Sequence, residues 1–214
     1  MTPRTPAFTP RFRAEFAELI QWRRDVRRFT AAPVDPGILS ECLELANLAP
    51  SVGLSQPWRF IQLDDQARRD RIVASFQRCN ADALQTYDGE TAGKYARLKL
   101  EGLREAPVHL AVFADTATAQ GKQLGRHTMP EMLNYSVVTA VHTLWLAARA
   151  HGLGVGWVSI LDPADVAKAC DAHPDWSLIA YLCIGWPEAD SREPELQRAE
   201  WETRSGLNGN FRCI

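Results

Sequence analysis

The chain has 214 residues, of which 46% are hydrophobic, a composition that supports one compact core. Its formal charge is -2 at pH 7 and its pI is about 6.2, so no overall basic field predicts binding to nucleic acid or to an anionic membrane. We expect a single domain over residues 1–214, with the N-terminal dozen residues and the C-terminal tail extended, and a small molecule or a protein as its partner.

The cysteines are odd in number, widely spaced and never arranged as C-x-x-C; they are Cys42, Cys79, Cys170, Cys183 and Cys213. This pattern fits neither a disulfide framework nor a zinc site, so we expect reduced thiols, no metal and a cytoplasmic location. The histidines also lack the spacing of metal ligands. The N-terminus has no apolar signal core, and the longest apolar stretch, 137–148, is shorter than a membrane span.

The first half of the chain predicts helices before a strand. Apolar spacing after a Thr-Pro start predicts a helix over residues 9–24, and Asp35-Pro36 predicts the N-cap of a second helix that Pro50 ends. Residues 58–63 are expected to form a short strand, and Asp65 to open a helix toward Arg78. The polar, helix-compatible segment 80–105 is a candidate lid.

The second half alternates strands and helices. Residues 108–114 are apolar and branched, as in a buried strand, and a long polar loop follows. Thr128 and Glu131 match the T-x-x-E capping box of a helix over 132–151 that is apolar on nearly every face. Asp162-Pro163 predicts another helix start, and 178–187 a last core strand. This order predicts helices packed on both sides of one sheet.

Three alternate glycines, Gly152, Gly154 and Gly156, invite comparison with a dinucleotide-binding loop. Such a loop follows a strand and opens a helix, and the order here is reversed. Gly152 instead suits a left-handed helix C-cap, so the stretch VGWVSI is expected to be a strand. Gly154 and Gly156 would weaken that strand unless something passes close to it, either a packed neighbouring element or a planar ring.

Two further stretches could carry chemistry. RRDVRRF, residues 23–29, sets four arginines around one aspartate, and guanidinium forks suit phosphate. The alternative is a solvated basic helix end. APSVGLSQPWRF, residues 49–60, offers small residues and an amide to a flat ligand, or is an ordinary loop between helix and strand.

Taken in order, these stretches resemble the nitroreductase superfamily. The resemblance runs from about Arg23 to Arg204 and includes RRDVRRF, APSVGLSQPWRF, YARLKLEGLREAP, the segment from Thr128 to Ile160, and LIAYLCIGWP. It implies an α+β fold, with a mixed β-sheet and helices on both sides. It also implies an interlocked homodimer with flavin sites at the subunit interface, to which the C-terminal tail would contribute.

The resemblance assigns a role in flavin binding to particular residues. Arg23, Arg24 and Arg27 would hold the phosphate and ribityl end of FMN, with Arg204 as a further phosphate ligand. On the ring, Ser51, Gly53 and Gln56 would approach one side, and the strand from Gly156 to Ile160 would pass the N5 edge. The expected flavin-binding set is Arg23, Arg24, Asp25, Val26, Arg27, Ser51, Gly53, Gln56, Gly156, Ser159 and Arg204.

Two positions indicate a particular branch. Common nitroreductases carry a serine or threonine in the arginine motif, whereas this chain has Asp25. Ser159 matches the serine that this branch places near the flavin C4a and N5 atoms. In that branch reduced FMN is the substrate and O2 the co-substrate, and the products include 5,6-dimethylbenzimidazole, the lower ligand of cobalamin, and erythrose 4-phosphate.

The resemblance therefore predicts Asp25 as general acid and base and Ser159 as a hydrogen-bond donor to the reacting edge of the flavin. It also predicts a separate flavin reductase as the source of reduced FMN. Two alternatives stay open from the sequence. One is an NAD(P)H-dependent nitroreductase or flavin reductase that keeps its FMN, and the other is a non-catalytic flavin-binding protein.

Overall fold

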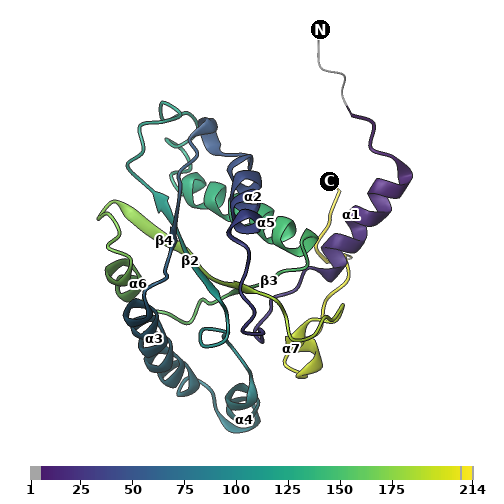
Figure 1. The fold of residues 1–214 in the computed structure, drawn as a ribbon, viewed down its shortest axis with the longest axis vertical. Helices are drawn as coiled ribbons and strands as arrows, with labels where there is room; N and C mark the ends of the chain where they lie inside the picture. The colour runs from purple at the N-terminus through teal and green to yellow at the C-terminus, as the bar shows by residue number, and fades with distance from the viewer. Residues whose placement is uncertain (1–5, 208, 214) are drawn as a thin grey trace.

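A computed structural model describes residues 6–207 and 209–213 of the chain, and Figure 1 shows its fold. The elements are, in chain order, α1 (Pro10–Trp22), α2 (Pro36–Asn47), the 3-10 helix η1 (Val52–Leu54), β1 (Trp58–Gln62), α3 (Gln66–Leu84), α4 (Gly89–Arg97), β2 (Val108–Asp115), α5 (Met132–Ala150), β3 (Gly154–Trp157), α6 (Pro163–Ala169), β4 (Trp176–Gly185) and α7 (Glu195–Arg198). The four expected strands are all present. Within the described residues, no helix combines the length and the apolar character needed to cross a membrane.

The strands form one sheet in the order β1-β2-β4-β3, and every pair of neighbouring strands is antiparallel. The α+β class is confirmed, but the expectation of a mixed sheet is wrong for the strands that the structure describes. Parallel pairing is found there as an isolated bridge between Asp25 and Val155. It is a single bridge because the arginine motif touches the edge strand β3 at this point without forming a ladder.

The sheet separates two hydrophobic cores. Successive side chains of a strand point to opposite faces, so alternate residues of β2 belong to different cores. Leu110 and Val112 pack with α2 and α5, whereas Ala111 and Phe113 pack with the α3 and α6 side. In Figure 1, α2 and α5 lie on one side of the sheet and α3 and α6 on the other. The predicted arrangement of helices on both faces is confirmed.

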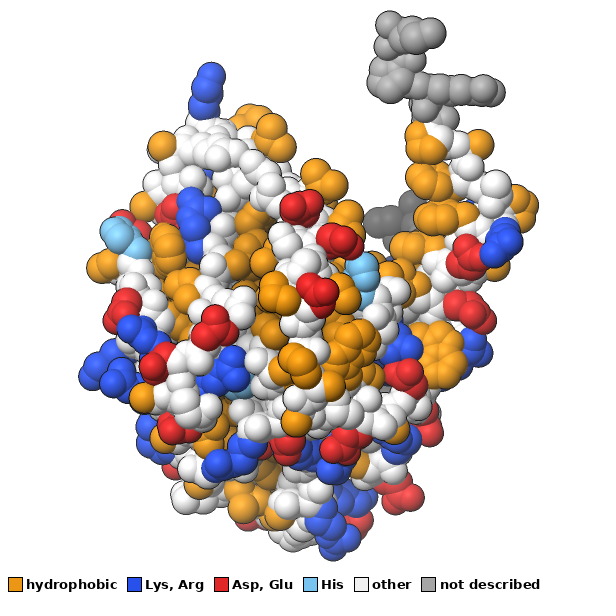
Figure 2. Space-filling model, in the orientation of Figure 1, with side chains coloured by type: hydrophobic (Ala, Val, Ile, Leu, Met, Phe, Trp, Pro, Cys, Tyr) orange, Lys and Arg blue, Asp and Glu red, His pale blue; other side chains and the backbone are white. Residues whose placement is uncertain are grey.

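Helix α1 leaves its apolar stripe uncovered. The Thr9 side chain caps it by accepting a hydrogen bond from the backbone N–H of Phe12 at 3.2 Å, so the helix starts within the N-terminal dozen residues that we expected to be extended. None of its residues is buried. Phe12, Phe16 and Ile20 recur at a spacing of four and are exposed. Figure 2 shows this helix standing away from the body with hydrophobic side chains along it.

Most predicted helix ends are confirmed. Asp35, Asp65 and Asp162 each accept a hydrogen bond from a backbone N–H in the first turn of the helix that follows. Gly152 has φ +83° and ends α5, because the N–H of Leu153 reaches back to the Ala148 carbonyl.

Two expectations about helix ends and tails are wrong. The capping box expected at the start of α5 does not form, since Glu131 occupies the N-cap position in αR conformation and no side chain caps the helix. The tail beyond Pro187 is not wholly extended either, because it contains the short helix α7.

Gly154 and Gly156 allow the arginine motif to pass close to β3. A Cβ built on Gly156 would lie 2.2 Å from the carbonyl oxygen of Val26, and one on Gly154 would lie 2.8 Å from Cγ2 of the same valine. The packing explanation therefore accounts for both glycines, and no planar ring is needed to explain them. They permit the contact that places the arginine motif along the edge of the sheet.

Replacing Gly156 should test this close contact. Gly156→Ala is expected to lower the free energy of unfolding by about 3 kcal/mol, because the obstructing atom belongs to the backbone and cannot rotate away. Gly206→Ala is the matched control, since a Cβ added there would meet nothing within 4 Å. Urea denaturation of both variants checks the difference, and equal midpoints would contradict the account.

Strand β2 contains a buried histidine, His109. His109 is 1% exposed, and its Nδ1 shares a hydrogen bond with the hydroxyl of the fully buried Tyr181 at 2.9 Å. Burial lowers the pKa of His109 to about 4, with a further lowering by Arg69 and a partial opposition from backbone hydrogen bonds to Ala106 and Leu103. The folded protein therefore holds this imidazole neutral at pH 7.

This histidine makes stability depend on pH in a defined window. Its ordinary pKa of 6.5 applies in the unfolded chain, so between pH 6.5 and about 4 the unfolded state binds a proton that the folded state does not. The contribution is complete above pH 6.5 and is lost as the pH falls toward 4, by about 3 kcal/mol in total. Denaturation of wild type and His109→Gln across pH 4–7 checks this, since the gap between the two should shrink on acidification.

Candidate functional site

The arginine motif follows α1 and crosses the end of β3. Helix α1 ends when Arg23 takes an extended conformation, with ψ 118°. The N–H of Val26 then donates to the Val155 carbonyl at 3.0 Å, and Phe29, 2% exposed, pairs with Pro187 in an isolated antiparallel bridge. The motif is therefore fixed at both ends to the sheet, with its polar side chains held between these anchors.

Asp25 is the most constrained polar group of the motif. Its Oδ1 accepts the backbone N–H of Trp157 at 3.0 Å, and its Oδ2 accepts Nε of Arg27 at 2.8 Å. Arg27 also donates from Nη1 to the carbonyl of Lys99 at 2.8 Å. The carboxylate thus connects the last residue of β3 to the segment that follows α4. Ser159 lies two residues beyond Trp157, is exposed, and follows the end of the strand that we expected to include it.

Three of the predicted phosphate ligands line one cavity together with Arg204. The cavity has a volume of about 190 Å³ and is lined by Arg23, Arg24, Asp25, Arg27, Pro194, Glu195, Leu196 and Arg204. The structure therefore brings Arg204 to the arginine motif across almost the whole length of the sequence. Helix α7 supplies the opposite wall.

The electrostatics of this cavity favour an anion. Burial first, then the positive charge of Arg204, lower the pKa of Arg23, and Asp25 only partly opposes this. The pKa of Arg24 is lowered by burial and by Arg204 and Arg23. Nε of Arg23 is buried without a hydrogen-bond partner among the described residues. A phosphate monoester would offset the like charges and satisfy this donor, so the residues present fit the phosphate of FMN.

Arg24 is less available to a ligand than its neighbours. Its Nε donates to the Arg192 carbonyl at 2.7 Å and its Nη1 to the Arg23 carbonyl at 2.6 Å. Arg23 instead lies with its guanidinium carbon 5.0 Å from the centre of the Trp145 ring, a cation–π contact. Trp145 lies in the apolar helix predicted over 132–151, and the sequence did not single it out as a site residue, because nothing in its local pattern indicates a distant arginine.

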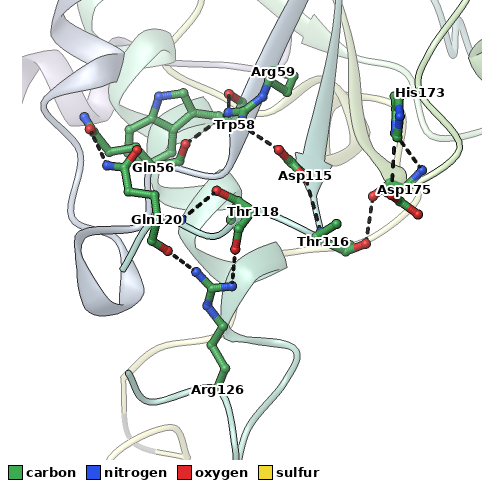
Figure 3. A network of polar contacts seen from close by, with 11 residues as sticks. Gln56, Trp58, Arg59, Asp115, Thr116, Thr118, Gln120, Arg126, His173 and Asp175 are labelled. Atoms are coloured by element: carbon green, nitrogen blue, oxygen red, sulfur yellow. Dashed lines mark hydrogen bonds and ion pairs between the residues drawn. The ribbon is translucent and has the colours of Figure 1, made fainter. Parts of the chain in front are cut away.

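The loop carrying Ser51, Gly53 and Gln56 is held by contacts within the chain. Ser51 Oγ accepts the backbone N–H of Gln56 at 3.1 Å, and Gln120 donates from Nε2 to Oε1 of Gln56 at 3.1 Å (Figure 3). A Cβ on Gly53, whose φ is +59°, would lie 2.9 Å from the carbonyl oxygen of Gly121. The loop after β2 therefore packs on this serine loop backbone to backbone.

The serine loop and the arginine motif contact opposite faces of α5. Ser136 accepts the N–H of Val52 at 3.0 Å, whereas Trp145 donates from Nε1 to the Arg24 carbonyl at 3.2 Å. These two α5 residues are nine apart, which is two and a half turns of helix and about 14 Å along its axis. The structure does not bring the two predicted halves of the flavin site together within one chain.

The described residues contain no group of three or more His, Cys, Asp or Glu side chains placed to hold a metal ion. The five cysteines are all free thiols.

Comparison with known proteins identifies the family. The profile of the Nitroreductase family matches residues 20–186. The chain is 57% identical over 199 residues to a 5,6-dimethylbenzimidazole synthase of Rhodospirillum rubrum, covering 93% of this chain and 94% of that one. It is 45% identical over 195 residues to a 5,6-dimethylbenzimidazole synthase of Rhodobacter capsulatus, covering 91% and 94%.

Among solved structures, oxidised iodotyrosine deiodinase bound to FMN and 3-iodo-L-tyrosine superimposes with a TM-score of 0.70. It is 27% identical and covers 82% of this chain and 91% of its own. The fold, the matched profile and the high identity over nearly full length agree with one another. The chain therefore belongs to the nitroreductase family, and it is similar in sequence over nearly its full length to 5,6-dimethylbenzimidazole synthases.

Proposed function

We propose that this protein consumes reduced FMN and O2 and forms 5,6-dimethylbenzimidazole and erythrose 4-phosphate, providing the lower ligand for cobalamin. The observation that carries the proposal is Asp25, which replaces the serine or threonine of common nitroreductases and is fixed by Trp157 and Arg27 beside the arginine cavity. The identity of 57% to a 5,6-dimethylbenzimidazole synthase supports it.

Reduced flavin would supply the electrons that reduce O2. The residues of this chain would bind and orient the flavin, neutralise its phosphate and transfer protons. Arg23, Arg27 and Arg204 would hold the phosphate and ribityl end. Asp25 would take a proton from the ribityl chain at Oδ2, the oxygen that now accepts from Arg27, while its Oδ1 stays on the Trp157 N–H. Ser159, exposed two residues further on, would donate to the reacting edge of the ring.

The product assay tests both assignments. Purified protein with FMN, a flavin reductase and NADPH in air is expected to form 5,6-dimethylbenzimidazole, measured by mass spectrometry. Asp25→Asn keeps the shape and an acceptor for Trp157 but loses the proton acceptor, so product formation should fall about 100-fold or more. Ser159→Ala removes a hydrogen-bond donor, and we expect a loss of about 100-fold.

Two exposed positions outside the cavity provide matched controls, Asp70→Asn on α3 and Ser177→Ala on β4. Both should retain the parental rate. Bound FMN that is reduced and reoxidised without product would favour a nitroreductase, a flavin reductase or a flavin-binding protein. Product at the parental rate from Asp25→Asn or Ser159→Ala would overturn the role assigned to that residue.

We further propose a homodimer in which each flavin site combines the arginine motif of one protomer with the serine loop of its partner. Two observations support it. The two motifs lie on opposite faces of α5 within one chain, so one copy cannot apply both to the same ligand. The apolar stripe of α1 is exposed along its length, and burying it requires a partner surface.

Mixed dimers test the shared site. Arg23→Ala and Gln56→Ala, inactive alone, are unfolded and refolded together so that subunits mix at random. Half of the dimers then contain one of each, with one intact site per dimer, and activity should recover to about a quarter of the parental value. No recovery, with mixed dimers verified by mass, would show that both residues act within one chain.

We expect a cytoplasmic enzyme, in keeping with its five free thiols. We also expect a separate flavin reductase to supply reduced FMN, because the chain must receive its substrate already reduced.

A further inference from the structure

Three aromatic rings join the α4 segment to the C-terminal tail. Tyr87 and Tyr95 stack with ring centres 4.8 Å apart at 29°. Trp201 meets the edge of this pair, with its ring centre 5.6 Å from Tyr87 at 87° and 6.2 Å from Tyr95 at 62°. Such aromatic pairs stabilise a junction beyond the area that they bury. We refer to these three residues as the aromatic latch.

A strained turn directs Trp201 toward the latch. The N–H of Trp201 donates to the Leu196 carbonyl at 2.9 Å and the N–H of Glu200 to the Gln197 carbonyl at 3.0 Å, the hydrogen-bond pattern of a Schellman motif that ends α7. Glu200 occupies the left-handed position with φ +54°, which usually favours glycine. The chain reverses here, and Arg204 follows three residues after Trp201.

The latch is the packed part of a loosely filled junction. Beside it, a cavity of about 320 Å³ lies between the end of α4 and α7, and its lining includes Arg27, Arg97, Lys99 and Arg198. Arg28 adds a fifth cation to this lining and Glu195 a carboxylate, so like charges outnumber opposite ones and the two helices gain little from direct contact there. Figure 1 shows α4 and α7 at the same end of the molecule, away from α2.

The latch is also connected to the candidate catalytic carboxylate. Tyr95 is 6% exposed and donates its hydroxyl to Asn80 Oδ1 of α3 at 2.8 Å, which fixes one end of α4. Two residues beyond this same, C-terminal end of α4, the Lys99 carbonyl accepts a hydrogen bond from Arg27, which pairs with Asp25. Arg204, three residues along the chain from Trp201, is therefore linked through the latch, the C-terminal end of α4 and Arg27 to Asp25.

We propose that Trp201 is a positioning residue that makes capture of the substrate phosphate by Arg204 and closure of the α4 segment a single event. This rests on the proposed function for the identity of the phosphate ligand. When Arg204 engages the phosphate, the tail is drawn in, and Trp201 holds Tyr87 and Tyr95 with it. A flavin without phosphate leaves the tail unengaged and the segment mobile.

Hydrogen exchange of amides 89–97 tests the coupling, with the full protein saturated by oxidised FMN or by riboflavin, which lacks the phosphate. In the wild type, exchange should be about tenfold slower with FMN than with riboflavin. Trp201→Ala should show the same exchange rate with FMN as with riboflavin, and so should Tyr87→Ala. Trp201→Phe retains an aromatic ring and should keep most of the difference.

Phe211→Ala is the matched control, because Phe211 is an aromatic residue of the same tail, 71% exposed and beyond Arg204. It should preserve the wild-type difference. A phosphate-dependent difference that survives in Trp201→Ala, or that is absent from the wild type, overturns the latch. The experiment involves no turnover, so it tests the latch separately from the reaction. A wild type that shows the exchange difference but makes no 5,6-dimethylbenzimidazole would contradict the proposed reaction and still support the latch.

Discussion

The carboxylate of Asp25 is the interaction on which the candidate site depends. It accepts one hydrogen bond from the backbone of β3 and one from Arg27, and so joins the arginine motif to the sheet and to the segment after α4. This arrangement is possible because Gly156 lets the Val26 carbonyl approach to a distance that no side chain would allow. The carbonyl of Val26 must therefore pack closely against β3 for the neighbouring Asp25 side chain to reach its two hydrogen-bond donors.

The arginine cavity shows how burial can prepare a site for an anion. Arg23 and Arg204 face the same space, their like charges repel, and one buried donor of Arg23 has no partner among the described residues. These features lower the stability of the protein, and a phosphate bound in the proposed site would offset that loss. Folding stability is instead supplied by the two cores on either side of the sheet, which are packed with aliphatic and aromatic side chains.

Helix α5 separates the two halves of the predicted site. It supports the serine loop near its N-terminus and the arginine motif near its C-terminus, on opposite faces. Nine of the 19 residues of α5 are buried, so the helix is a rigid support and neither half can move to meet the other within one chain. The expectation that α5 is covered on nearly every face is wrong for this chain, because Tyr135 and Val138 are exposed. The same geometry that prevents a site within one chain suits a site shared between two copies.

The sequence by itself determined the four strands and the helices that pack on the sheet, because apolar periodicity, Asp caps and the left-handed Gly152 are local signals that act within a few residues. It did not predict α7. Through a resemblance spread over most of the chain, it also predicted which motifs would bind the flavin. Only the tertiary structure decided that the sheet is antiparallel and that Gly156 faces Val26. Tertiary structure also decided that Trp145 contacts Arg23 and that Trp201 contacts Tyr87. These contacts join residues far apart in the chain, and their partners are chosen by packing in space, which no local pattern records.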